Sequence, residues 1–193
     1  MTATLRQTAL IVALLNLGYF GVEFAAAIRI GSVSLFADSI DFLEDTAINL
    51  LIFAALGWTA ARRARTGMVL AALMVVPAAA FLWTLTQKYL SPVPPDPAVL
   101  TLVGLGALAV NLTAAVLLAR NRKAEGSLTR AAFLSARNDA LANIAVIGAG
   151  LMTAAHPSIW PDVIVGLAIA ALNLDAAHDV WQAAHREARD AKA

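Results

Sequence analysis

Four acidic residues stand close together in a segment that is otherwise apolar. Asp38, Asp41, Glu44 and Asp45 all lie within residues 33–58. On a helix, Asp38, Asp41 and Asp45 fall on one face, because they are three and four positions apart. An aspartate at the middle of a membrane costs about 2.5–3.5 kcal/mol on insertion scales. These carboxylates therefore need protons, partners of opposite charge or a polar cavity.

Asp41 and Asp45 are one helical turn apart, so both carboxylates can point at a single cation. Two adjacent anions repel each other, and when no metal is bound at least one of them tends to hold a proton. A divalent cation that binds there displaces this proton. The pair is therefore typical of a protein that exchanges a cation for protons.

A second polar set lies in residues 131–155. Ser135, Asp139 and Asn143 are four positions apart and share one helical face, with Asn138 beside them. A zinc-type site usually has four ligands, of which the two carboxylates of the first segment supply only two. The two segments enter the membrane from opposite sides, so both polar sets can lie near its middle. We expect the second set to complete the cation site.

The composition places these residues in a membrane protein. Of the 193 residues, 60 % are apolar and 14 % charged, and the mean hydropathy is +0.74. This excludes a disordered chain, a nucleic-acid binder and an ordinary soluble enzyme. The absence of cysteine excludes disulfides and thiolate metal ligands. The predicted fold is all-α, with residues 1–180 forming a six-helix transmembrane domain and 181–193 a short cytoplasmic tail. The spans are expected near 5–28, 33–58, 67–90, 98–119, 131–155 and 159–180.

The basic residues predict the orientation of these spans. With the N-terminus in the cytoplasm, eleven of the 14 Lys and Arg residues lie inside, whereas Arg29 and Lys88 lie outside and Arg137 lies within a span. This bias follows the positive-inside rule. Both termini are therefore predicted to be cytoplasmic, in a multi-pass protein of the plasma membrane or bacterial inner membrane.

The acidic segment resembles the second helix of the cation diffusion facilitator family. That family carries an Asp, then a His or Asp three residues later, then an Asp four further on. Asp139 matches the second member of the family's His-x-x-x-Asp pair, and Asn16 and Glu23 fit the polar face of its first helix. The resemblance covers residues from about 8 to 180. The matching stretches are Gly31-Ser32, Asp38-Ser39-Ile40-Asp41-Phe42-Leu43-Glu44-Asp45 and Trp160-Pro161-Asp162-Val163-Ile164-Val165-Gly166.

The resemblance implies that Asp41, Asp45 and Asp139 are ligands of a transported metal. In this family the metal is most often zinc, with cadmium, cobalt, iron or manganese in other branches. The implied mechanism is alternating access driven by proton antiport, which exports metal from the cytoplasm. Ser135 stands where the family usually has His, so the site becomes all-oxygen. Oxygen ligands favour harder cations such as manganese.

The remaining polar residues are expected to support this site. Asp38 is predicted to orient the helix or the ligands, Asn138 and Asn143 to support the site, and Asn16 and Glu23 to line its cavity. The metal is the cargo, and no permanent cofactor and no nucleic-acid partner are expected. The family's cytoplasmic domain has no counterpart among the few residues after Val180. A homodimer would therefore form through membrane helices, where small residues permit close approach: Gly148, Ala149 and Gly150.

Three alternatives remain open. The first is a transporter of a harder cation, manganese or iron, and the second a degenerate relative that acts as a sensor or assembly partner. The third is a membrane metalloenzyme, which is disfavoured because such enzymes usually supply His ligands and the first five spans contain no histidine. His178 and His185, seven positions apart, would form either a cytoplasmic metal-collecting site or part of a solvated tail.

Overall fold

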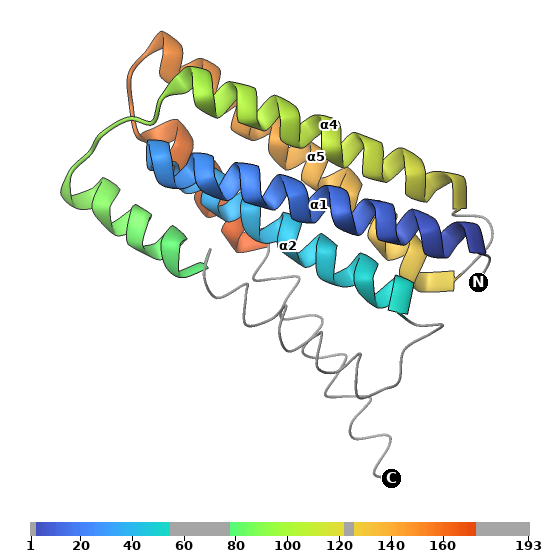
Figure 1. Ribbon diagram of the computed structural model, residues 1–193. Helices are drawn as coiled ribbons and strands as arrows, with labels where there is room; N and C mark the ends of the chain where they lie inside the picture. The colour runs from blue at the N-terminus through green and yellow to red at the C-terminus, as the bar shows by residue number, and fades with distance from the viewer. Residues whose placement is uncertain (1–2, 55–77, 122–125, 173–193) are drawn as a thin grey trace.

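The protein is a bundle of long helices (Figure 1). The computed structural model describes residues 3–54, 78–121 and 126–172, and within them it contains six helical segments and no strand. Four are labelled in Figure 1: α1 (Ala3–Ile30), α2 (Val33–Ala54), α4 (Pro97–Asn121) and α5 (Gly126–Ala155). The other two are the helical stretches 78–90 and 160–172. The predicted all-helical fold is confirmed.

The helices follow the predicted spans closely where both are described. α1, α2 and α4 begin within two residues of their predicted starts, and α5 begins earlier, at Gly126. Residues 67–77 of the third span, residues 173–180 of the sixth and the tail at 181–193 lie outside the described residues. His178 and His185 therefore lie outside them as well.

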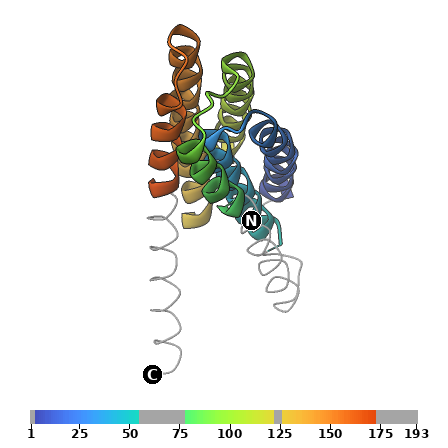
Figure 2. The same ribbon diagram turned by 90° about the vertical axis from the view of Figure 1, so that its left-hand side faces the viewer.

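Four helices form the centre of the bundle. The most extensive packing joins α4 to α5 and α1 to α2, and α1 also packs on α4 and α2 on α5. The stretches 78–90, in green, and 160–172, in orange-red, lie together on one side of this group (Figures 1 and 2). The first turn of α2, the end of 78–90 and the start of 160–172 meet at one end of the bundle, which we call the Asp162 end.

Local chemistry sets the helix boundaries at this end. Gly31 ends α1 with φ at 61°, a conformation that glycine adopts without strain, and the Ser32 amide donates back to the Ala27 carbonyl at 3.2 Å. Ser32 Oγ then accepts a hydrogen bond from the Leu35 amide at 3.2 Å at the start of α2. These two contacts reverse the chain within two residues and place α1 and α2 side by side.

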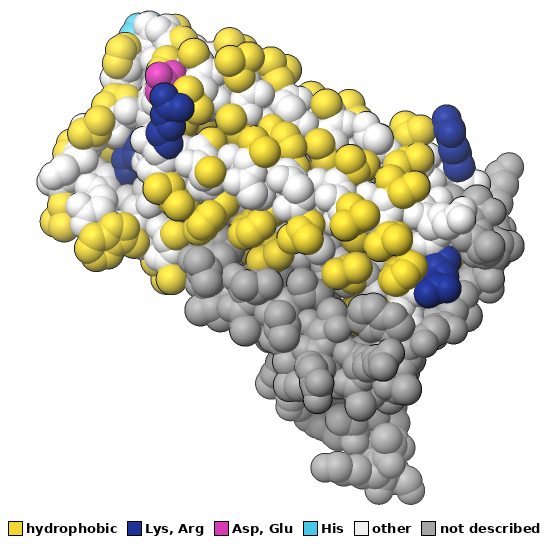
Figure 3. Space-filling view, in the orientation of Figure 1, with side chains coloured by type: hydrophobic (Ala, Val, Ile, Leu, Met, Phe, Trp, Pro, Cys, Tyr) yellow, Lys and Arg dark blue, Asp and Glu magenta, His cyan; other side chains and the backbone are white. Residues whose placement is uncertain are grey.

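The outer surface of the bundle is apolar. Large hydrophobic side chains are exposed on several helices, including Leu14, Trp83, Leu102, Leu141 and Leu172. On the face seen in Figure 3, Lys and Arg gather at the two ends, and hydrophobic side chains cover the middle. By length and composition, Leu5–Ile30 and Pro97–Arg120 can each cross a membrane, and Trp160–Leu172 is a shorter apolar helix. A soluble protein rarely exposes an apolar surface of this extent.

Inside the bundle, two apolar clusters enclose a polar layer. The first cluster lies toward the Asp162 end and includes Val33, Phe36, Ala37, Leu100 and Val146. The second lies toward the N-terminus and consists of Ala9, Val12, Ile52, Ala114, Ala115, Leu118 and Ala136. In sequence, each of α1, α2, α4 and α5 passes from one cluster to the other through buried polar residues. The polar layer is therefore built by all four central helices.

The small residues of α5 pack within the chain. A Cβ added at Gly150 would lie 3.0 Å from the Thr101 amide nitrogen and 3.3 Å from the Pro97 carbonyl, both in α4. Ala149 is 2 % exposed and belongs to the first apolar cluster. Of the three residues predicted to permit a dimer contact, Gly148 has open space around the position of an added Cβ. Gly150 and Ala149 are instead covered by packing within the chain.

We expect Gly31→Ala to destabilise the protein by about 1–2 kcal/mol, because a Cβ is strained at positive φ. Thermal unfolding in detergent would measure the change. Gly148→Ala is the matched control, since it lies within α5 with space for a methyl group and should be neutral or stabilising by up to about 1 kcal/mol. Equal stability of the two variants would contradict the assignment of Gly31.

Candidate metal centre

Asp45 contacts the first helix through an amide. It is 2 % exposed, and Asn16 Nδ2 donates to its Oδ2 at 3.3 Å. One turn further along α2, Asn49 Nδ2 donates to the Asp45 backbone carbonyl at 2.9 Å. Thr46 bonds back to the Phe42 carbonyl at 2.7 Å. The α1–α2 packing thus places Asp45 at the wall between the two helices.

Asp38 lies at one end of an amide relay, Asn111 to Asn143 to Asp38, that joins three helices. It is fully buried, and its Oδ2 accepts a hydrogen bond of 2.6 Å from Asn143 Nδ2 in α5. Asn143 Oδ1 in turn accepts one of 2.9 Å from Asn111 Nδ2 in α4. A carboxylate can only accept, so these two donors orient both amides. The relay fixes α2, α4 and α5 at the level of the polar layer.

Glu23 faces Asp38 from α1. It is 0 % exposed, and within the described part of the chain neither of its carboxylate oxygens receives a hydrogen bond from a donor group. The charges of the two carboxyl groups act on each other, and no hydrogen bond joins the two groups. Two ionised carboxylates buried side by side repel each other. The Glu23–Asp38 pair is therefore favourable only when a proton or another cation compensates part of this charge.

Asp41 lies near several like charges. Among the described residues, the charged groups that act on its carboxylate are Asp139 of α5 and three acids of α2, namely Asp38, Glu44 and Asp45. Asp41 and Asp139 are half-buried. The antiparallel passage of α2 and α5 through the polar layer thus brings the two predicted acidic sets within electrostatic range of each other.

The predicted residues do not all converge. Among the described residues, no three Asp, Glu, His or Cys side chains are placed to hold a metal ion together. The side chain of Ser135 lies outside the described residues. Asn138, which is predicted to support the site, is exposed and accepts a weak hydrogen bond from Arg137 at 3.4 Å.

Comparison with known proteins agrees with this architecture. The profile of the cation efflux transmembrane domain matches residues 9–182, most of the chain. The chain belongs to the cation efflux family. A comparison with curated proteins gives no significant match. The family assignment confirms the resemblance of the α2 motif to cation diffusion facilitators. It identifies the chain as a membrane protein that transports metal cations.

Two buried amides of this cation efflux protein have no role in the motif-based prediction. Asn111 donates to Asn143, which in turn donates to Asp38, and Asn49 donates to the Asp45 backbone carbonyl. Both are almost completely buried within otherwise apolar helices. A buried side-chain amide costs free energy unless it has partners, so a lone Asn in an apolar span is itself a signal of a polar contact. Its partner depends on helix packing, and the spacing of residues within one helix does not reveal it.

We expect Asn143→Val to destabilise the protein by about 1–3 kcal/mol, because it leaves the Asp38 carboxylate and the Asn111 amide without their partners. Denaturation in detergent would measure the loss. Thr113→Val is the matched control, since its hydroxyl is exposed and bonds only within α4. If both variants unfold at the same point, the relay contributes no stability.

Proposed function

We propose that this cation efflux protein exports a divalent metal cation from the cytoplasm in exchange for protons. The cation would bind in the polar layer at Asp41, Asp45 and Asp139, and Ser135 would complete or shape the site. The helices would expose this site alternately to the two sides of the membrane. The protein would act as a transporter and not as an enzyme, with the metal and the protons as its substrates.

The proposal rests on the negative charges that lie around Asp41. Within the described part of the chain, the charged groups that act on its carboxylate are acidic. Several like charges held close together in an apolar bundle repel one another and favour the uptake of a cation or protons. A divalent cation or protons would remove this repulsion. A structural role would instead pair the acids with basic side chains, as the protein does with Asp162 and Lys88 at 3.9 Å.

The same repulsion supports the coupling to protons. When the metal leaves, the acids of α2 and α5 are relieved of their mutual repulsion by taking up protons. When the metal returns, its charge displaces those protons. Because the layer is enclosed by an apolar cluster on either side, neither ion would pass without a conformational change. This supports exchange rather than a channel.

The charge distribution supports an orientation. By the positive-inside rule both termini would lie in the cytoplasm, so the Asp162 end would face the outside of a plasma membrane or bacterial inner membrane. A homodimer would form through membrane helices, as the resemblance implies. Gly150 and Ala149 are used for packing within the chain, so such a dimer would use exposed apolar surface instead.

The donor set decides which metal the site would favour. Zinc, cadmium and cobalt are the cations that the family resemblance supports. The all-oxygen set created by Ser135 favours manganese or iron, because harder cations prefer oxygen ligands. A non-transporting role as a sensor or assembly partner stays as the alternative if no metal is moved.

We expect Asp45→Ala to abolish metal-driven proton flux in proteoliposomes while the protein still inserts and elutes as before. The substitution removes a carboxylate of the polar layer. Asp96→Asn is the matched control, because Asp96 is an exposed acid outside the bundle and flux should persist. Zinc, cadmium, cobalt, iron and manganese would each be tested. Undiminished flux in Asp45→Ala would refute the site, and no flux in the parent protein would refute transport.

We expect Ser135→His to shift the metal preference toward zinc by about tenfold or more relative to manganese, because imidazole is a better zinc ligand than a hydroxyl. The ratio of zinc-driven to manganese-driven flux would measure this shift. Ser135→Ala controls for loss of the hydroxyl alone. An unchanged ratio in Ser135→His would exclude position 135 from the metal site.

A further inference from the structure

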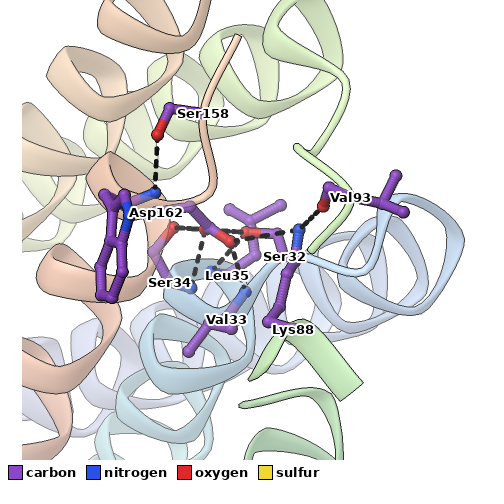
Figure 4. Close-up of polar contacts among 9 residues, drawn as sticks. Ser32, Val33, Ser34, Leu35, Lys88, Val93, Ser158 and Asp162 are labelled. Carbon is purple, nitrogen blue, oxygen red and sulfur yellow. Dashed lines mark hydrogen bonds and ion pairs between the residues drawn. The ribbon is translucent and has the colours of Figure 1, made fainter. Parts of the chain in front are cut away.

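Asp162 connects three helices at one end of the bundle (Figure 4). Its carboxylate accepts hydrogen bonds from the backbone amides of Val33 at 2.9 Å and Ser34 at 3.0 Å. It also accepts from the hydroxyls of Ser32 at 2.6 Å and Ser34 at 2.7 Å. Lys88 Nζ, from the end of 78–90, lies 3.9 Å away and donates to the Val93 carbonyl at 2.5 Å. One side chain thus attaches the first turn of α2 to the two flanking helices.

This contact differs from an ordinary helix cap. α4 begins with a local cap, in which Asp96 Oδ1 accepts from the amides of Ala98 and Val99 just along the chain. α2 has a local cap at Ser32 as well, but its Val33 and Ser34 amides donate to an acid that lies 128 residues away in sequence from Ser34. The carboxylate is well placed for this, because the N-terminus of a helix attracts negative charge. The bond that completes α2 is therefore also a bond between helices.

The contact of Asp162 with Lys88 and the first turn of α2 is buried, so separating its groups is costly. Asp162 is 0 % exposed and Lys88 is 4 % exposed. A buried charge that loses its partners carries a large penalty, so partial separation is unfavourable until water can enter. Helix 160–172 also lies directly on α2 at Gly166, where an added Cβ would be 2.8 Å from the Val33 carbonyl carbon. The helices must separate together or stay together.

The first apolar cluster lies between this contact and the polar layer. Val33, Phe36 and Ala37 of α2 pack there with Phe81 of stretch 78–90 and Val163 of stretch 160–172. Ala37 is fully buried and stands one helical turn before Asp41. The same three elements that meet at Asp162 thus close the route from this end of the bundle to the carboxylates. Separation at Asp162 would loosen the cluster as well.

We propose that the contact of Asp162 with Lys88 and the first turn of α2, which we call the Asp162 latch, keeps the outer side of the metal route closed. Asp162 is a positioning residue: it touches neither metal nor ligand, and it acts by fixing the first turn of the helix that carries the ligands. Opening requires water to replace the donors around the carboxylate, after which the stretches 78–90 and 160–172 can move away from α2. The outward direction rests on the proposed function, whereas the closure itself does not.

The absence of native cysteine allows a direct test. A single cysteine is introduced by Ala37→Cys, and sealed vesicles are treated with a charged, membrane-impermeant methanethiosulfonate on either face. The labelling rate is then compared after adding Asp162→Asn, Lys88→Met or Ser34→Ala. Asp96→Asn is the matched control, since it weakens an acid cap at the same end without joining helices.

We expect slow labelling of the parent from both faces. Asp162→Asn should accelerate labelling from the Asp162 end by about tenfold or more, because it removes a charge-assisted contact. Lys88→Met and Ser34→Ala should accelerate it less, and they remain informative if Asp162→Asn does not fold. Labelling from the opposite face should not change in any variant.

Three results would overturn the latch. The first is no acceleration in the folded variants, and the second is equal acceleration from both faces, which would indicate general loosening. The third is an increase in Asp96→Asn equal to that in Asp162→Asn. Labelling does not depend on transport, so a parent protein without metal flux would refute the proposed function and leave this test intact.

Discussion

The burial of carboxylates in the middle of an apolar bundle is the constraint on which the rest of this structure depends. Glu23 and Asp38 are completely inaccessible, and Asp45 nearly so. Each requires donors or cations, because a carboxylate buried in a largely apolar bundle is unfavourable without them. Asparagines on α1 and α5 donate to Asp45 and Asp38, and an asparagine on α4 supports the α5 donor. The packing of the four central helices is thus fixed at the level where the acids lie.

The amides satisfy only part of this requirement. Asp38 receives one hydrogen bond from Asn143, while its second oxygen and both oxygens of Glu23 receive none from the described residues. Asp162 is the contrasting case, because four hydrogen bonds and Lys88 surround its carboxylate. The donors around Asp162 hold three helices together, whereas the unsatisfied oxygens of Glu23 and Asp38 leave a buried polar group that a proton or cation would stabilise.

Apolar clusters lie on the two sides of the polar layer. An acid layer that was open on both sides would leak ions, and one that was closed on both sides would be inert. The cluster near Asp162 is built partly from the stretches 78–90 and 160–172, which lie beside the central four helices. Movement of these stretches relative to α2 would open one side without disturbing the amide relay through Asn143.

The sequence alone determined the all-helical architecture, the approximate positions of the described helices and the family. The reason is that these depend on local hydrophobicity and on acidic spacing within one helix. It also singled out Asn143 and Glu23, whose side chains meet Asp38 in the fold. Only the tertiary structure decided which polar groups touch. It paired Asn16 with Asp45, extended the relay to Asn111, turned Asn138 outward and used Gly150 inside the chain. It also joined Asp162 to the start of α2 across 128 residues of sequence. Such contacts depend on the rotation and depth of helices relative to each other, which the spacing of residues within a single helix does not encode.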